Sequence, residues 1–208
     1  QIDYDSGNFS QALQWSARYL ERFGQGTDAR SMRELRGELL YLLRHYEEAI
    51  EYFEEMAGRE GEKRLSAQIK LADIYRNLDR RNDEARVLDS IISASPGQRS
   101  PIMEQALFLR ATQLKESGEL QRAMTLYREF LESYPDSHHT DWAMYHLAQI
   151  TMEVSSHQEA LTLVHDILSR STDTILLSAA TSLANEIDLD RDIQDFHLRR
   201  TRFSEGAP

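Results

Sequence analysis

A short phrase recurs along this chain at a nearly constant spacing, and this period constrains the fold more than any other feature. The clearest copy runs from Gly118 to Pro135, where apolar residues follow Ala123 at steps of three and four. The phrases are centred on alanines that lie 36 to 38 residues apart: Ala12, Ala49, Ala85, Ala123 and Ala160. A fixed period of this length is typical of a repeat array, in which each unit buries its apolar face against its neighbours.

Each phrase has the apolar periodicity of one face of a helix, and a second helical pattern precedes most copies. Glycine- and proline-containing segments such as 58–61 and 95–101 separate the resulting pairs. Hydrophobic residues make up 40% of the chain, which is enough for a packed core. The sequence therefore predicts an all-α fold of about five antiparallel helix pairs.

We predict a single repeat domain over residues 1–208. Its units are a partial repeat at 1–27, four repeats at 28–61, 62–98, 99–137 and 138–171, and a capping helix pair at 172–204. The two helices of the cap are expected at 172–189 and 191–202, the second being the more polar.

The amino end has the pattern of a second helix without the first helix of its pair. Gly7 is expected to break the helix there. Leu13, Trp15 and Tyr19 then lack a covering helix, which predicts an exposed apolar edge. We interpret the chain as cut from a longer protein, and expect a second copy or a preceding repeat to cover this edge. Self-association would then occur through the amino end.

Charge weighs against nucleic acid as a partner, because the formal net charge is −11. Release of counterions drives binding to DNA or RNA and needs a basic stripe, whereas only short mixed runs such as 76–86 are present. We interpret the acidity as a solvated outer surface. No apolar run approaches the roughly 18 residues of a membrane span, so no direct membrane insertion is expected.

No pattern for catalysis or for a cofactor is found. The chain has no cysteine, which excludes thiolate nucleophiles and cysteine-based zinc sites. Three histidines and an aspartate lie close together in sequence: His138, His139, Asp141 and His146. Two of these histidines fall on a helix-breaking segment, and Asp141 is a natural helix cap, so we favour a solvated loop over a metal site. Phosphate-binding and nucleophile motifs are absent, and we predict no catalytic residues.

The repeat pattern resembles the tetratricopeptide repeat family, which places a small residue in the first helix, an alanine in the second and a proline at the end. The best unit has these matching residues: Leu107, Ala111, Leu114, Gly118, Ala123, Tyr127, Phe130 and Pro135. Two others match at Gly37, Leu40, Tyr46, Ala49, Phe53 and Met56, and at Met144, Leu147, Ala148, Ala160, Val164 and Ile167. The resemblance implies a right-handed α-solenoid, a TPR-like superhelix.

Three features depart from the family pattern. The spacing exceeds the usual repeat of about 34 residues. The unit near Leu71 needs one inserted residue to bring Ala85 into register, and Arg110 stands where a leucine is expected.

In this family the first helices line a concave groove that holds an extended peptide or a partner helix. The resemblance therefore implies a protein–protein interaction scaffold that needs no cofactor. The groove positions carried over are Glu34, Glu38, Tyr41, Asp73, Arg76, Asn77, Phe108, Thr112, Lys115, Trp142, Tyr145, Gln149 and Met152. The alternative for Phe108, Trp142 and Tyr145 is that they only pack between neighbouring repeats.

The charges of these positions indicate the kind of partner. Some relatives grip a C-terminal carboxylate with Lys and Asn, but the matching places here hold Glu34, Glu38, Ile69 and Asp73 and should repel such a tail. We expect instead a segment that carries Lys or Arg first and apolar anchors after it.

A finer resemblance concerns location. The phrase FLESYPDS at 130–137 is similar to repeats of bacterial cell-envelope proteins, including outer-membrane assembly lipoproteins and the cell-division coordinator that works beside the Tol–Pal system. It implies the bacterial periplasm or cell envelope. Two alternatives to a peptide scaffold stay open: a structural or oligomerisation segment of a larger envelope assembly, or the recruiting domain of an enzyme whose catalytic part lies outside these residues.

Overall fold

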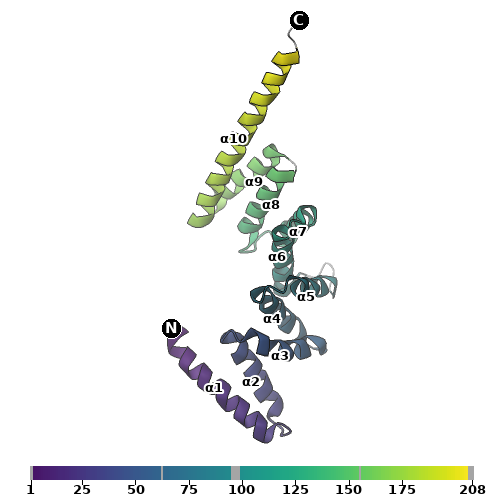
Figure 1. Cartoon of the computed structure of the whole chain (residues 1–208), viewed down its shortest axis with the longest axis vertical. Helices are drawn as coiled ribbons and strands as arrows, with labels where there is room; N and C mark the ends of the chain where they lie inside the picture. Colours follow the sequence, from purple (N-terminus) through teal and green to yellow (C-terminus); the bar gives the residue numbers. More distant parts are fainter. Residues whose placement is uncertain (1, 62, 95–98, 155, 206–208) are drawn as a thin grey trace. The chain divides into compact units, whose positions relative to one another are not determined.

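A computed structural model describes the backbone of residues 2–61, 63–94, 99–154 and 156–205, and every regular element in these ranges is a helix (Figure 1). The all-α prediction is confirmed, with ten helices in the described ranges. The chain divides into two compact units, unit 1 at 1–98 and unit 2 at 99–208, and each is described by itself. One continuous repeat domain over 1–208 stays a prediction.

Unit 1 consists of five helices, each of which packs against the next along the chain. Their bounds are α1 Ile2–Phe23, α2 Ala29–Leu42, α3 Tyr46–Gly58, α4 Lys63–Asn77 and α5 Arg81–Ala94. Part of the core of this unit is a cluster of buried side chains from α2, α3 and α4, with Phe53 and Ile74 almost without exposure.

Unit 2 is built in the same way from five further helices. Their bounds are α6 Pro101–Glu116, α7 Leu120–Ser133, α8 Thr140–Val154, α9 His157–Arg170 and α10 Thr174–Glu205. The α8 helix also contacts α6 and α10, so the first helices of successive pairs lie next to one another. Ser100 begins α6 by accepting a hydrogen bond from the Met103 N–H, as an N-cap residue does.

The predicted small residues are buried in both helices of a pair. Ala111 and Ala123 have no exposed surface and stand twelve residues apart, and the same offset joins Gly37 to Ala49 and Ala148 to Ala160. At Gly37 the requirement is steric, because a Cβ there would overlap the side chain of Tyr52. Close packing of helices therefore explains these positions.

The second helix of 62–98 is present, but its predicted central residue is wrong. Glu84, and not Ala85, occupies the central buried position. Glu84 stands twelve residues after the fully buried Ala72, has no exposed surface, and donates its backbone N–H to the carbonyl of Arg80. Ala49 and Ala123 make the same bond to the residue four positions earlier. Ala85 is only half-buried. A carboxylate replaces the usual alanine here because two arginines surround it.

Two predicted helix breaks are absent. The α1 helix runs through Gly7 without interruption. One glycine costs a helix only about 1 kcal/mol, which the surrounding backbone hydrogen bonds offset. The predicted capping pair is a single helix of 32 residues, α10. No glycine or proline lies between 172 and 202, and an ion pair between Asp188 and Arg191 at 2.9 Å spans the expected break.

Enlarging the central alanine of α7 should weaken the fold. Ala123→Leu is expected to lower the free energy of unfolding by about 1–3 kcal/mol, because overpacking forces neighbouring side chains and helices to shift. Urea denaturation followed by far-ultraviolet circular dichroism measures the loss. Gln121→Leu is the matched control, since Gln121 is exposed on the same helix. Equal midpoints for the two variants would show that Ala123 does not lie at a tight helix contact.

Candidate functional site

The predicted groove residues fall on the first helices of the pairs in both units. We call Glu34, Glu38, Tyr41, Asp73, Arg76 and Asn77, on α2 and α4, the first-helix face of unit 1. We call Phe108, Thr112, Lys115, Trp142, Tyr145, Gln149 and Met152, on α6 and α8, the first-helix face of unit 2.

In unit 1, Tyr41 and Asp73 join the two helices of the face. The Tyr41 hydroxyl donates to Asp73 Oδ2 at 2.8 Å, and the Asn77 amide donates to the Asp73 carbonyl at 2.8 Å. Burial and the neighbouring Asp73 carboxylate raise the pKa of Tyr41, so its hydroxyl stays protonated and keeps donating. The bond from Tyr41 to Asp73 thus links α2 to α4.

The carboxylates expected to make unit 1 acidic already have cationic partners. Lys63 pairs with Glu34, and Lys70 pairs with Glu38. The Lys70 ammonium also lies 5.6 Å from the centre of the Tyr41 ring, within the range of a cation–π contact. Both lysines lie on α4, about thirty positions after the α2 carboxylates with which they pair. Their pairing leaves this face with much less free negative charge than the predicted residues alone suggest.

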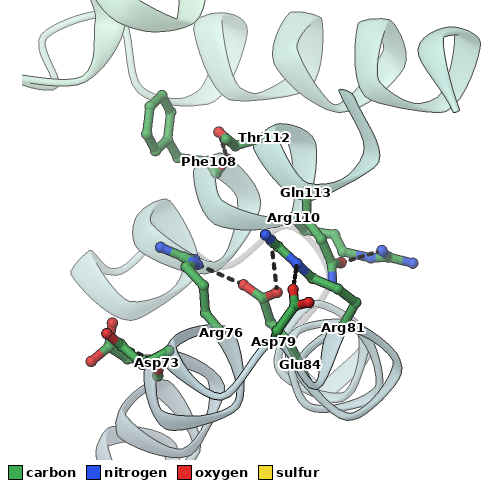
Figure 2. Close-up of polar contacts among 10 residues, drawn as sticks. Asp73, Arg76, Asp79, Arg81, Glu84, Phe108, Arg110, Thr112 and Gln113 are labelled. Carbon is green, nitrogen blue, oxygen red and sulfur yellow. Dashed lines mark hydrogen bonds and ion pairs between the residues drawn. The ribbon is translucent and has the colours of Figure 1, made fainter. Parts of the chain in front are cut away.

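Arg76 binds inside its own helix pair. Its Nε donates to Glu84 Oε1 at 2.8 Å, and Arg81 approaches the other Glu84 oxygen at 3.8 Å and donates to Asp79 at 3.0 Å (Figure 2). These arginines explain how a carboxylate is tolerated at a fully buried position. Arg76 thus joins α4 to α5.

In unit 2, Trp142 and Tyr145 form an aromatic pair on α8. Their ring centres lie 5.8 Å apart at 85°, the edge-to-face geometry that aromatic rings prefer. Both rings and Met152 pack against the core cluster of α8, α9 and α10, yet all three side chains are only half-buried. They therefore combine a fixed position with exposed apolar surface.

A row of hydrogen bonds connects this pair to Lys115 on α6. The Lys115 ammonium donates to Gln149 Oε1 at 2.8 Å and lies 3.4 Å from His146 Nδ1, and the Gln149 amide donates to the Tyr145 hydroxyl at 3.3 Å. Burial lowers the pKa of Lys115. Burial and the adjacent ammonium lower the pKa of His146 to about 4, so this imidazole is neutral at neutral pH. The sequence interpretation considered His146 only as a metal ligand and missed its place in this row.

Phe108 packs inside unit 2, as the alternative interpretation held. Its ring stacks on His139 at 4.4 Å and 12°, and lies 5.7 Å from Phe130 and 6.3 Å from Tyr127. Thr112 bonds back to the Phe108 carbonyl at 2.9 Å (Figure 2) and contacts the Tyr127 hydroxyl at 3.0 Å. Phe108 therefore supports the start of α8 through His139, and Thr112 links α6 to α7 through Tyr127.

The amino edge is partly as expected. Trp15 is 67% exposed and Phe23 50%, and the tilted rings of Tyr19 and Phe23 lie 5.3 Å apart. Leu13, in contrast, packs against the core cluster of unit 1. Covering by α2 explains this difference, since α1 and α2 pack together.

Metal-ligand clusters and membrane-spanning helices are both absent from the described part of the chain. Among the residues whose side chains the structure describes, no group of three or more histidines and carboxylates could hold a metal ion. Over the same residues, no helix combines the length and the apolar character needed to cross a bilayer.

Comparison with known proteins agrees with the fold. Residues 105–137 match the sequence profile of the tetratricopeptide repeat. No curated protein matches the sequence. The structure is similar to that of YrrB, described as a TPR protein with an unusual peptide-binding site, with a TM-score of 0.63 and 18% identity over 87% of this chain and 88% of YrrB.

Two further solved structures show the same likeness. BtubC from P. vanneervenii has a TM-score of 0.61 at 14% identity and covers 100% of this chain and 94% of its own. TPR-like repeats of a putative kinesin light chain from Podospora anserina have a TM-score of 0.58 at 16% identity over 95% and 94%. Residues 105–137 are thus a tetratricopeptide repeat, and the chain has the fold of tetratricopeptide-repeat proteins.

Proposed function

We propose that this chain is a non-catalytic protein-interaction scaffold that docks a segment of a partner protein on the first-helix face of unit 2. The observation that carries this proposal is the half-buried pair of Trp142 and Tyr145, held on α8 and tied to α6 through Gln149 and Lys115. Large aromatic side chains in fixed positions bury much surface at little entropic cost, and such residues dominate binding energy at interfaces.

The fold supports this proposal in a general way. YrrB, which shares the fold, is described as having a peptide-binding site. Docking needs neither a cofactor nor catalytic residues, and the row of Lys115, Gln149 and Tyr145 offers hydrogen bonds to a bound chain. We propose that the first-helix face of unit 1 is a second, more polar contact surface, where Lys63 and Lys70 share the charge of Glu34 and Glu38.

A second candidate function is self-association through α1. The exposed Trp15 and Phe23, both on α1, favour it, because exposed apolar surface of large side chains tends to become covered. Sedimentation at increasing protein concentration separates the candidates, since a Trp15→Ala change should weaken only self-association.

We also propose a location for the chain, the bacterial cell envelope. Envelope placement rests on the phrase at 130–137, but three residues of that phrase have structural roles. Phe130 is fully buried, Tyr134 contacts the Ser100 backbone, and Ser137 bonds to Glu104. The fold therefore accounts for these three residues of the phrase. A recruiting role beside a catalytic domain would use the same docking face.

The test of docking uses peptides selected from a random display library against the whole chain. Trp142→Ala is expected to weaken their binding by about 2 kcal/mol or more, the usual scale of a hot spot. Trp15→Ala is the matched control, because it removes the other tryptophan from a different surface. If Trp142→Ala retains full helicity and binds as well as the control, the first-helix face of unit 2 is not the docking site.

A further inference from the structure

The chain has three lysines, and only one of them has no carboxylate partner in the described part of the molecule. Lys63 and Lys70 pair with Glu34 and Glu38 across neighbouring helices of unit 1. The contacts of the Lys115 ammonium are the amide oxygen of Gln149 and the ring nitrogen of His146. A half-buried ammonium held only by neutral groups has lost hydration without gaining an opposite charge.

The surroundings of Lys115 do not supply that charge. Glu116 and Glu153 act on it at longer range, but burial outweighs them and the pKa of Lys115 falls. His146 is neutral at neutral pH, because burial and the ammonium lower its pKa to about 4. Gln149 is held by both Lys115 and the Tyr145 hydroxyl, so it fixes the ammonium beside the aromatic pair. The arrangement is complementary to an incoming carboxylate.

We infer that Lys115 is the subsite for the side-chain carboxylate of an Asp or Glu in the docked segment, while Trp142 and Tyr145 take an apolar residue of the same segment. This inference rests on the proposed docking function and reverses the sign of charge that the sequence predicted for the partner. The carboxylate belongs to a side chain and not to a chain end, because the face continues past Gln149 to the half-buried Met152. The bound segment therefore continues on both sides of the charged residue.

The geometry also sets a spacing in the partner. Gln149, which holds the Lys115 ammonium, follows Trp142 by seven residues on α8, which is about 10 Å along a helix axis. An extended segment covers that length in about three residues. The acidic residue and the apolar anchor should thus stand about three positions apart.

The experiment selects random peptides, displayed with fixed flanks on both sides, against the whole chain. Peptides that bind should be enriched in Asp or Glu about three positions from an aromatic or aliphatic residue. Lys115→Gln should weaken their binding roughly tenfold, and changing the acidic residue of the peptide to its amide should have the same effect. Combining both changes should add little, as expected for two partners of one interaction.

Arg122→Gln is the matched control, because Arg122 is an exposed cation on α7, outside both first-helix faces, that already pairs with Glu119, and it should leave binding unchanged. Circular dichroism checks that each variant keeps its helices. No enrichment of acidic residues, or full affinity in Lys115→Gln, would overturn the carboxylate subsite. If Trp142→Ala still abolishes binding in that case, the proposal of docking on the first-helix face of unit 2 is retained. If no peptide is selected, or if neither variant changes binding, the proposed function fails as well.

Discussion

Reversing the charge of Glu84 should be among the most damaging single changes in unit 1. Glu84 has no exposed surface and receives a hydrogen bond from Arg76, with Arg81 close to its second oxygen. Glu84→Lys would remove this carboxylate and place a buried ammonium beside the guanidinium groups of Arg76 and Arg81. We expect a loss of about 3–5 kcal/mol in the free energy of unfolding, the scale for a buried charge that has lost its partner. Urea denaturation followed by circular dichroism measures it.

Glu51→Lys provides the control for this variant. Glu51 lies on α3 of the same unit and its side chain is exposed, so the same reversal should change the free energy of unfolding by less than about 0.5 kcal/mol. A Glu84→Lys protein as stable as this control would show that Glu84 is not the buried counterpart of Ala49 and Ala123.

Removing the Tyr127 ring should cost a similar amount in unit 2 and should also disturb the docking face. Tyr127 is fully buried, and its ring lies 5.7 Å from His146 and 6.3 Å from Phe108. Tyr127→Ala is expected to lower the free energy of unfolding by about 3–5 kcal/mol through the cavity it leaves. The Tyr127 ring lies next to His146, and His146 contacts Lys115. Peptide binding should therefore weaken too, although Tyr127 is not itself exposed.

Tyr127→Phe separates the ring from its hydroxyl. The phenol contacts Thr112 Oγ1 at 3.0 Å, and Thr112 keeps its bond to the Phe108 carbonyl when the phenol is removed. The expected cost is therefore about 1 kcal/mol, with peptide affinity nearly unchanged. Equal losses in the Ala and Phe variants would contradict the view that packing of the ring supports this face.

Periodicity was sufficient to predict α2 to α9 as helix pairs, but not the uninterrupted α1 and α10. Ala111, Ala123 and Phe130 carry the repeat pattern in the sequence and are fully buried in the structure. Turns were less predictable. Gly118 signals the turn between α6 and α7 and has a φ of 79°. In the equivalent turns after α2 and α4, Arg44 and Asp79 adopt the same left-handed conformation without a glycine.

Interactions between distant residues explain what the sequence could not show. Glu84 looks like a surface residue until Arg76 and Arg81 are placed beside it. The pairing of Lys70 with Glu38 joins residues 32 positions apart on different helices. The role of His146 depends in the same way on Lys115, which is 31 positions earlier. A local pattern of residue types contains none of these contacts, so it could not predict the charge of the candidate site.

Fluorescence of Trp142 tests docking on unit 2 most directly. The chain has two tryptophans, and Trp15→Phe leaves Trp142 as the only one. When this variant is titrated with a selected, dye-labelled peptide, the emission of Trp142 should shift to shorter wavelength and its quenching by acrylamide should fall, in step with the rise in peptide anisotropy. Saturable peptide binding with no change in the emission or quenching of Trp142 would contradict the proposal that this face is the docking site.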